Sequence, residues 1–391
     1  KNYLIRIVVI LLLSLMICPI RASAVEMENE EQESDAGYSI GIQAPHAVLM
    51  EASTGTVLYE KDAHVGVPPA SVTKIMTMLL IFEALEDDKI KPEDTVVVSE
   101  RAASMGGSQV FLEPNEKQTV DTMLKCIAVA SANDACVAMA EYVSGSEEAF
   151  VNKMNERAKK LGMENTRFVN CNGLDVEGHV TSAYDIALMS RQLLKYHPDI
   201  KKYTTIWMDT IRDGTFGLSN TNKMVRFYQG ATGLKTGFTQ QAGYCLSASA
   251  ERDGMELIAV VMGCETSQKR FAACKSMLDY GFANFAVVTP QLTEEAFVPV
   301  RMGSREWVQA VPGNQNALLV DKSQRNAVTT EIKLDEQVTA PVSQGQRLGT
   351  LTVRCGEQVL EQIPLVAAET IPRLSFGEIF LHMFKAVLQA K

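Results

Sequence analysis

Ser71 and Lys74 are residues whose types and spacing could perform covalent chemistry. They stand in the sequence Ser71-Val72-Thr73-Lys74, so on a helix their side chains lie one turn apart on the same face. A serine hydroxyl is a poor nucleophile that needs a neighbouring base, and a lysine among apolar neighbours loses its proton more readily and can act as that base. The pair therefore predicts an acyl-transfer site, although a helix cap and a surface lysine would have the same spacing.

Two further motifs have residues suited to the same reaction. Ser131–Asn133 reads S-A-N at the end of a predicted helix, where a hydroxyl can relay a proton to a leaving amine and an amide can orient a peptide. Lys235–Gly237 reads K-T-G at the start of a predicted strand, where lysine and threonine can hold a carboxylate and glycine admits a substrate backbone. Taken singly, these residues could instead cap helices or protect a strand edge. Each of the patterns S-x-x-K, S-x-N and K-T-G occurs once and in this order, which argues against coincidence.

Strands are expected at both ends of residues 38–285, with helices between them. Turn residues and short β-rich runs predict two hairpins, His46–Glu51 with Thr56–Glu60 and Gly243–Ala250 with Met255–Met262. Apolar residues at helical spacing predict the intervening helices, at Ile75–Phe82, at Val120–Ile127, from about Ala135 and at Ala149–Leu161. The pattern indicates an α/β domain with one mixed sheet assembled from distant segments.

The rest of the chain is divided by changes in composition. Lys1 and Arg6 precede the apolar run Ile7–Ile17 and a small-residue ending, so residues 1–24 are interpreted as a secretory signal peptide. The alternatives are a buried N-terminal helix and a retained anchor. An acidic linker is expected over residues 25–37. Because 391 residues exceed what one core normally holds, a second domain is expected, and short alternating runs predict a small β-sandwich over residues 286–370.

The last segment, residues 371–391, has apolar and polar residues interleaved. It is too short and too interrupted to span a membrane, but it predicts an amphipathic helix that lies in a membrane interface. The alternative is a helix packed on the β-rich domain.

Charge, cysteine and histidine usage exclude several classes of partner. The formal net charge of −10 becomes −13 without Lys1, Arg6 and Arg21, which argues against nucleic acid. Seven of the eight cysteines remain without Cys18, none forms C-x-x-C, and most have apolar neighbours, so small buried side chains are expected rather than a disulfide framework. The five histidines show no paired spacing typical of zinc sites. No metal and no organic cofactor are therefore expected.

The three motifs together resemble the active-site set of the serine penicillin-recognising enzymes, which include penicillin-binding proteins and class A β-lactamases. Longer stretches, such as Ala47–Glu51, Ala130–Cys136 and Gly233–Thr239, resemble low-molecular-mass penicillin-binding proteins of the D-alanyl-D-alanine carboxypeptidase type, or S11-type peptidases. The resemblance covers roughly His46–Phe282. It implies a transpeptidase-like α/β fold with a mostly antiparallel sheet flanked by helices, followed by the small β-rich domain and the amphipathic helix.

The resemblance also implies a role for each motif residue. Ser71 would be acylated, Lys74 would accept its proton and Ser131 would relay that proton. Substrate would be bound by the remaining positions: Asn133 at the amide, Lys235 and Thr236 at the terminal carboxylate, Gly237 by admitting the backbone, and the N–H groups of Ser71 and Phe238 as the oxyanion hole. Some relatives carry histidine where Phe238 stands, which leaves the contribution of this side chain open.

The expected activity is removal of the terminal D-alanine from peptidoglycan pentapeptides, with β-lactams as covalent inhibitors, on the outer face of a bacterial cytoplasmic membrane. Three alternatives stay open: a DD-endopeptidase or transpeptidase, a β-lactamase of the same fold, and a non-catalytic wall-binding protein. A class A β-lactamase would need a deacylating glutamate, usually in an E-x-x-L-N string, and the sequence has no such string. The intact Ser71, Lys74, Ser131 and Lys235 argue against the non-catalytic alternative.

Overall fold

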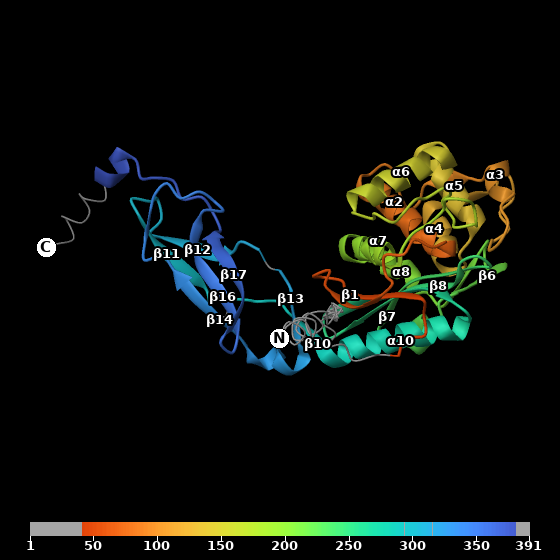
Figure 1. The fold of residues 1–391 in the computed structure, drawn as a ribbon. Coiled ribbons are helices and arrows are strands. Elements are labelled where there is room, and N and C mark those ends of the chain that lie inside the picture. The colour runs from red at the N-terminus through yellow and green to blue at the C-terminus, as the bar shows by residue number, and fades with distance from the viewer. Residues whose placement is uncertain (1–40, 293, 315, 381–391) are drawn as a thin grey trace, which may run out of the picture. The chain divides into compact units, whose positions relative to one another are not determined.

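The computed structural model describes residues 41–292, 294–314 and 316–380 (Figure 1). The predicted signal peptide 1–24, the predicted acidic linker 25–37 and residues 381–391 of the predicted amphipathic segment lie outside the described residues. The described chain forms an α/β part that ends with a long helix, and a β-rich part that follows it in sequence.

A five-stranded antiparallel sheet forms the centre of the α/β part. Its strand order is β2-β1-β9-β8-β7, and the strands are β1 (His46–Glu51), β2 (Val57–Lys61), β7 (Ala231–Thr239), β8 (Gly243–Arg252) and β9 (Met255–Cys264). Both predicted hairpins are present. Asp253 and Gly254 have φ angles of 51° and 79°, the left-handed values that a two-residue hairpin turn requires. The sheet joins strands from both ends of the α/β part, as the sequence predicts, because β1 pairs with β9.

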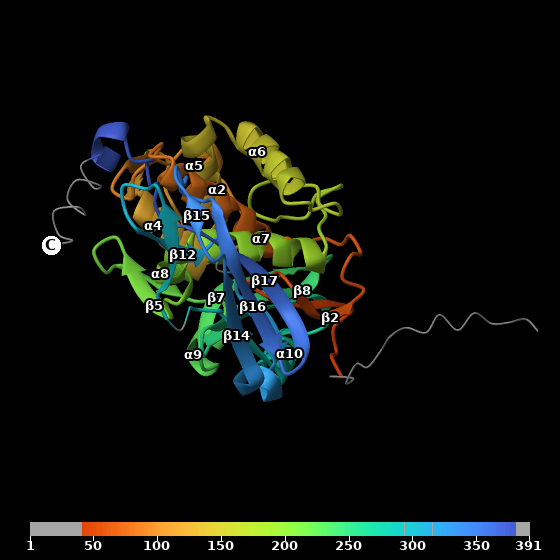
Figure 2. The same ribbon diagram turned by 90° about the vertical axis from the view of Figure 1, so that its left-hand side faces the viewer.

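Helices cover both faces of this sheet. Helix α10 (Ser267–Asn284) lies along one face, and α2 and α4 to α7 stand on the other, as two views at right angles show (Figures 1 and 2). These and the shorter helices are α2 (Lys74–Glu86), α3 (Glu100–Ala103), α4 (Val120–Val129), α5 (Asn133–Ser144), α6 (Glu147–Lys160), α7 (Ala183–Tyr196), α8 (Lys201–Thr204), α9 (Met224–Phe227) and the 3₁₀ turns η1 (Ala70–Thr73) and η2 (Pro198–Ile200). Two small hairpins accompany them, β3 (Thr95–Val97) with β4 (Lys117–Thr119) and β5 (Met208–Ile211) with β6 (Phe216–Ser219).

The central strands separate two hydrophobic cores. Alternate residues of β1 point in opposite directions: Val48 and Met50 pack under the α2 and α7 side, whereas Ala47 and Leu49 pack against the α10 side. Since both faces are buried, this strand is a continuous apolar run and not a polar–apolar alternation. A substrate can therefore reach this sheet only at its edges.

Polar caps fix where several helices begin. Thr119, Ser146, Ser182 and Thr266 each accept a hydrogen bond from the backbone N–H three residues later, at the starts of α4, α6, α7 and α10. Each cap contributes about 1 kcal/mol to its helix. The four predicted helices are confirmed as α2, α4, α5 and α6, with ends that differ by a few residues, whereas the sequence pattern did not identify α7 or α10.

The β-rich part contains a six-stranded sheet and a two-stranded one. The larger sheet has the order β14-β16-β17-β12-β11-β15, and β10 pairs with β13. The elements are β10 (Phe285–Val288), β11 (Ala296–Arg301), β12 (Trp307–Pro312), β13 (Leu318–Asp321), η3 (Lys322–Ala327), β14 (Val328–Leu334), β15 (Val338–Thr339), β16 (Arg347–Cys355) and β17 (Gln358–Ala367). Alternating residues such as Val298, Val300, Val308 and Ala310 supply its core. The boundaries at residues 286 and 370 stay predictions.

The segment after β17 is extended before it becomes helical. Ile371 and Arg373 form bridges with Val342 and Gly303, and the helix begins at Phe376, later than residue 371 where the amphipathic segment was predicted to begin. Ser375 caps this helix by accepting from the N–H of Glu378. Among the described residues no helix has the length and apolar character needed to cross a membrane.

Candidate active site

Ser71 and Lys74 lie within hydrogen-bond distance at the junction of η1 and α2. Ser71 belongs to the 3₁₀ turn η1 and the α-helix begins only at Lys74, so the pair spans two helix types and not the single helix that the sequence predicts. The contact itself is present: Lys74 Nζ donates to Ser71 Oγ at 2.9 Å. Ala70, directly before Ser71, has a φ of 49°, a strained left-handed value for a residue with a Cβ.

Lys74 is completely buried, and its ammonium group is surrounded by acceptors. Besides Ser71 Oγ, Nζ donates to Asn133 Oδ1 and to the carbonyl oxygen of Asn172, both at 2.6 Å. Burial lowers the pKa of Lys74, because removal from water disfavours the charged form. The two stronger acceptors keep Nζ in place, so on losing a proton the nitrogen can direct its lone pair at the Ser71 hydroxyl.

In the second motif, Asn133 is held by hydrogen bonds, whereas the Ser131 hydroxyl has no hydrogen-bond partner among the described residues. Asn133 starts α5 and is clamped by the preceding loop, since its Nδ2 donates to the carbonyl of Gly106 and its backbone N–H to that of Ser108, each at 2.7 Å. Ser131 joins α4 to α5 with a φ of 62°. Its Oγ is buried and has no hydrogen-bond partner within the described part of the chain, so the proton-relay role stays a prediction.

The third motif lies on β7, the edge strand that packs against η1. Lys235 is 1% exposed, and its Nζ donates to the carbonyl of Thr236 at 3.1 Å. Thr236 Oγ1 donates to Thr221 Oγ1 at 2.6 Å. A Cβ on Gly237 would lie only 3.1 Å from the backbone nitrogen of Ser71, so this glycine is required for β7 to approach the nucleophile.

Lys235 and Lys74 form a buried pair of like charges. Burial lowers the pKa of Lys235 well below its usual value, and the positive charge of Lys74 lowers it further. Two ammonium groups in one dry site repel each other, which favours a state in which one of the two is neutral. A substrate carboxylate would restore the charged form of whichever lysine it contacts.

Phe238 does not point into the same buried site. Its ring is 51% exposed and stacks on Tyr244, with ring centroids 4.2 Å apart. The preceding carbonyl, of Gly237, accepts a hydrogen bond from Arg270 Nη1 at 2.8 Å. Arg270 is 7% exposed and thus fixes the end of β7 from the α10 side.

Several residues of the site were missed by sequence reasoning. The carbonyl of Asn172 comes from a loop 98 positions after Lys74, and Arg270 looks like an ordinary charged helix residue beside Lys269. His179 is a third example. Its Nδ1 accepts from the N–H of Val169, so its Nε2 carries the hydrogen and donates to Thr73 in η1. Burial lowers the pKa of His179 to about 4, which keeps this histidine neutral.

Gly173 allows the Asn172 loop to pass over the nucleophile turn. It has a φ of +89°, and a Cβ there would lie 1.8 Å from the carbonyl oxygen of Ala70. Gly173→Ala should therefore lower the free energy of unfolding by about 3 kcal/mol or more, measured by denaturant titration. Gly162→Ala is the matched control: its φ is also positive, at +74°, but no atom lies within 4 Å, so it should cost only about 1 kcal/mol. Equal losses in both variants would contradict the steric argument.

The metal-ligating and thiol side chains of the described residues form no metal site. In residues 41–380, apart from 293 and 315, no group of three or more His, Cys, Asp or Glu side chains could hold a metal ion. The seven cysteines of that part are free thiols, and all except Cys355 are buried. The expectation of small buried side chains is thus confirmed for six of them.

Comparisons with known proteins agree with this geometry. A family model described as D-alanyl-D-alanine carboxypeptidase matches residues 29–266, and the model of the penicillin-binding protein 5 C-terminal domain matches residues 292–373. The chain is 44% identical to D-alanyl-D-alanine carboxypeptidase DacF of Bacillus subtilis over 377 residues, which covers 95% of this chain and 96% of the relative.

Solved structures show the same mixed α/β penicillin-binding fold. Penicillin-binding protein 5 of Haemophilus influenzae superposes with a TM-score of 0.72 at 30% identity, over 85% of this chain and 98% of that one. Penicillin-binding protein D2 of Listeria monocytogenes, in its ampicillin-bound form, superposes with a TM-score of 0.57 at 32% identity, over 62% of this chain and 98% of that one.

Proposed function

Because the chain belongs to the D-alanyl-D-alanine carboxypeptidase family, we propose that Ser71, Lys74 and Ser131 carry out its reaction and that β7 binds the substrate. The protein is a penicillin-binding serine hydrolase that acts on D-alanyl-D-alanine ends. The observation that supports these roles most directly is the 2.9 Å contact between Ser71 Oγ and the buried Nζ of Lys74.

In the first step neutral Lys74 takes the Ser71 proton while the oxygen attacks the carbonyl carbon of the penultimate D-alanine. The N–H groups of Ser71 and Phe238 would stabilise the negative oxygen that develops. The C–N bond then breaks, the proton passes through Ser131 to the amine, and D-alanine leaves. Water next attacks the ester on Ser71, which releases the shortened peptide and regenerates the hydroxyl.

The substrate end would lie along the edge strand β7. Asn133 would contact the substrate amide, Lys235 and Thr236 would bind its terminal carboxylate, and Gly237 would leave room for its backbone. The lowered pKa of Lys235 supports this assignment, because a buried ammonium group gains most from a carboxylate that neutralises it. Arg270, which donates to the Gly237 carbonyl, would help to hold the Phe238 N–H in the oxyanion hole.

Lys235→Gln should lower kcat/KM for a D-alanyl-D-alanine peptide by about 10-fold to 100-fold, the usual strength of a charge-assisted hydrogen bond. The same variant should leave hydrolysis of the C-terminally amidated peptide nearly unchanged, because that substrate offers no carboxylate. Steady-state kinetics on the two peptides measures the difference. If the variant impaired both substrates equally, the carboxylate assignment would be wrong.

Removal of one D-alanine is proposed as the main outcome over cross-linking or cutting of cross-links. Mass analysis of the products from a pentapeptide muropeptide separates these activities, since loss of one alanine, a cross-link and a cut cross-link have different masses. A β-lactamase activity is not favoured, because a class A β-lactamase needs a deacylating glutamate. The groups that contact Lys74 Nζ are instead a hydroxyl, an amide oxygen and a backbone carbonyl.

The proposed location is the outer face of the bacterial cytoplasmic membrane, where pentapeptide is available. Residues 1–24 would direct export, and the segment from Phe376 onward would lie at the membrane surface. Phe376 and Phe380 support this, since they are 85% and 64% exposed on a capped helix. A chain truncated after Arg373 should no longer sediment with membranes and should be found in the supernatant. If the truncated chain still sedimented with membranes, the tail would not be the anchor.

A further inference from the structure

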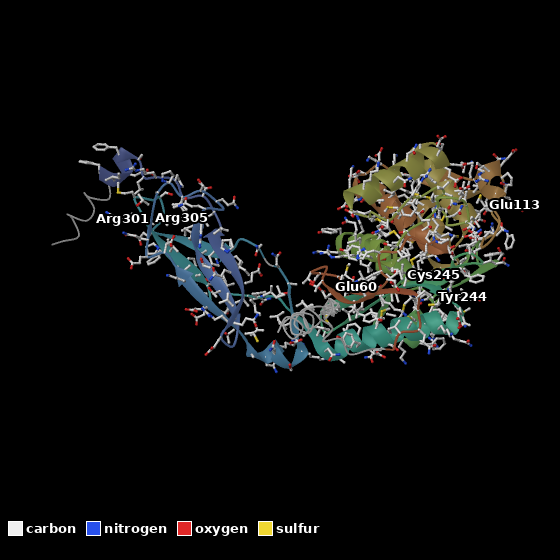
Figure 3. All side chains as sticks on the ribbon, in the orientation of Figure 1. Glu60, Glu113, Tyr244, Cys245, Arg301 and Arg305 are labelled. Carbon is white, nitrogen blue, oxygen red and sulfur yellow. The ribbon has the colours of Figure 1, made fainter. Side chains whose placement is uncertain are left out.

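A cavity lies on the α10 side of the central sheet, and none of the three motifs lines it. Its volume is about 600 Å³, within the range of pockets that hold small molecules. The walls come from α9, the start of β8 and the first turns of α10, and Figure 3 shows Tyr244 at this end of the sheet beside α10. We call this cavity the α10 pocket; the side chains that define it are Lys223, Phe227, Tyr244, Gln268, Phe271 and Lys275.

The α10 pocket combines aromatic surface with positive charge. Phe227, Tyr244 and Phe271 line it, and Phe227 is the most open of the three rings at 76% exposure. Lys223 and Lys275 stand at its wall, and neither forms a salt bridge within the part of the chain that the structure describes. No described Asp or Glu lines the pocket, although the whole chain has a net charge of −10. This composition fits a ligand that is both anionic and ring-bearing.

The first turn of α10 adds further anion donors to this wall. Ser267 and Gln268 are the first two residues of an 18-residue helix, so their N–H groups have no carbonyl within the helix to donate to. The neighbouring carboxylates face other cations: Glu265 pairs with Lys269, and Asp279 lies 3.9 Å from Arg252. The positive field of the pocket is therefore not cancelled by these groups.

Two contacts connect the α10 pocket to the end of β7. Tyr244, in the pocket wall, stacks on Phe238 with ring centroids 4.2 Å apart. The Arg270 guanidinium lies over the rings of Tyr244 and Phe271, at 5.3 and 4.9 Å, and donates to the Gly237 carbonyl. A ligand that contacts Tyr244 or Phe271 is thus separated from β7, the strand that would bind the D-alanyl end, only by the side chains of Phe238 and Arg270.

We propose that the α10 pocket binds the sugar-bearing, carboxylate-bearing part of a muropeptide. The proposal rests on the function proposed above, since it adds a second contact for the same substrate class. The exposed Phe227 ring can pack against the apolar face of a pyranose ring, and Lys223 and Lys275 attract the carboxylate on the second residue of the peptide. The bound sugar–peptide belongs either to the pentapeptide under attack or to a separate strand.

The test compares KM for three substrates with the same D-alanyl-D-alanine end. They are a disaccharide-pentapeptide, a free pentapeptide that lacks the sugars, and a diacylated tripeptide that lacks both the sugars and the second-residue carboxylate. The variant K223Q/K275Q should raise KM about threefold to tenfold for the first two substrates and leave the tripeptide unchanged, as expected for exposed charges. Phe227→Ala should raise KM for the disaccharide-pentapeptide alone.

Lys159→Gln, which removes one exposed charge from α6 on the opposite side of the sheet, is the matched control and should change none of the three values. A disaccharide-dipeptide, added while the tripeptide is hydrolysed, distinguishes the two sources. If the pocket takes a separate strand, the disaccharide-dipeptide changes the rate of tripeptide hydrolysis in the wild type but not in K223Q/K275Q. If the pocket takes the attached sugar, the disaccharide-dipeptide has no effect on that rate.

Equal KM changes for all three substrates, or no change for any, would overturn the α10 pocket as a binding site. The function proposed above is tested separately, because penicillin acylation of Ser71 and tripeptide hydrolysis do not require this pocket.

Discussion

Ser71→Ala is expected to abolish the covalent penicillin adduct and to lower D-alanine release by about 10⁴-fold or more, as loss of a nucleophile does in other serine hydrolases. The reason is that Ser71 Oγ is the hydroxyl held at 2.9 Å from Lys74 Nζ. Labelling with a fluorescent penicillin, followed by denaturing electrophoresis and peptide mass analysis, measures the adduct and its position.

The fold should survive this substitution. The Ser71 side chain makes one hydrogen bond, to Lys74, so its loss should change the free energy of unfolding by about 1 kcal/mol or less. Ser144→Ala is a matched control, because Ser144 Oγ accepts from Lys153 Nζ at the same 2.9 Å on the protein surface. It should label like the wild type. An adduct that persisted in Ser71→Ala, on whatever residue, would refute Ser71 as the nucleophile.

Lys74→Gln is expected to slow penicillin acylation by about 10²-fold to 10⁴-fold, the usual contribution of a general base. Glutamine removes the basic amine but keeps N–H donors on the side of Asn133 Oδ1 and the Asn172 carbonyl, so the loss would report mainly the missing base. Stopped-flow labelling measures the rate. Lys74→Arg should be similarly slow, since arginine stays protonated; near-normal acylation in Lys74→Arg would contradict the proposed proton transfer.

The pH dependence of acylation follows from the same group. Since burial lowers the pKa of Lys74, the neutral form accumulates, and acylation should rise, at pH values below the 10.5 of an ordinary lysine. Carboxylate binding should decline as Lys235, whose pKa is also lowered, loses its proton. The acylation rate of the wild type should therefore give a bell-shaped curve against pH, set by Lys74 and Lys235 together. Lys235→Gln should remove the fall of this curve at alkaline pH.

The stability of the protein is linked to the same proton. Between the lowered pKa of Lys74 and 10.5 the unfolded chain binds more protons than the folded one, so the free energy of unfolding should rise with pH there. Lys74→Gln should reduce that slope, as measured by denaturant titration at several pH values.

Local features of the fold could be predicted from the sequence. Turn residues and short β-rich runs located both hairpins of the central sheet, and the i, i+3 spacing placed Ser71 next to Lys74. The three motifs converge because β7 packs against η1 and α5 starts beside α2. Strands β14 and β17 are not obvious from the sequence, because β14 has polar side chains at four of its seven positions and β17 contains Pro364.

Other parts of the site depend on contacts that no local pattern reveals. The Asn172 carbonyl reaches Lys74 only because Gly173 lets its loop cross Ala70, and a single glycine is common in polar loops that make no such crossing. Arg270 is buried only because α10 lies under the end of β7. The 3₁₀ turn that carries Ser71 begins at Ala70 in a left-handed conformation, which the residue type of Ala70 does not favour.

The pairing of β1 with β9 determines how this chain can fold. His46 lies opposite Met262, so the central sheet closes only after almost the whole α/β part has been synthesised. Contacts of such long sequence separation carry a large loop-closure entropy and slow the search for the native state. The helices between them can form early, whereas β1 keeps an unpaired apolar edge until β9 arrives. Slow closure would leave the chain extended long enough to cross a membrane before it folds.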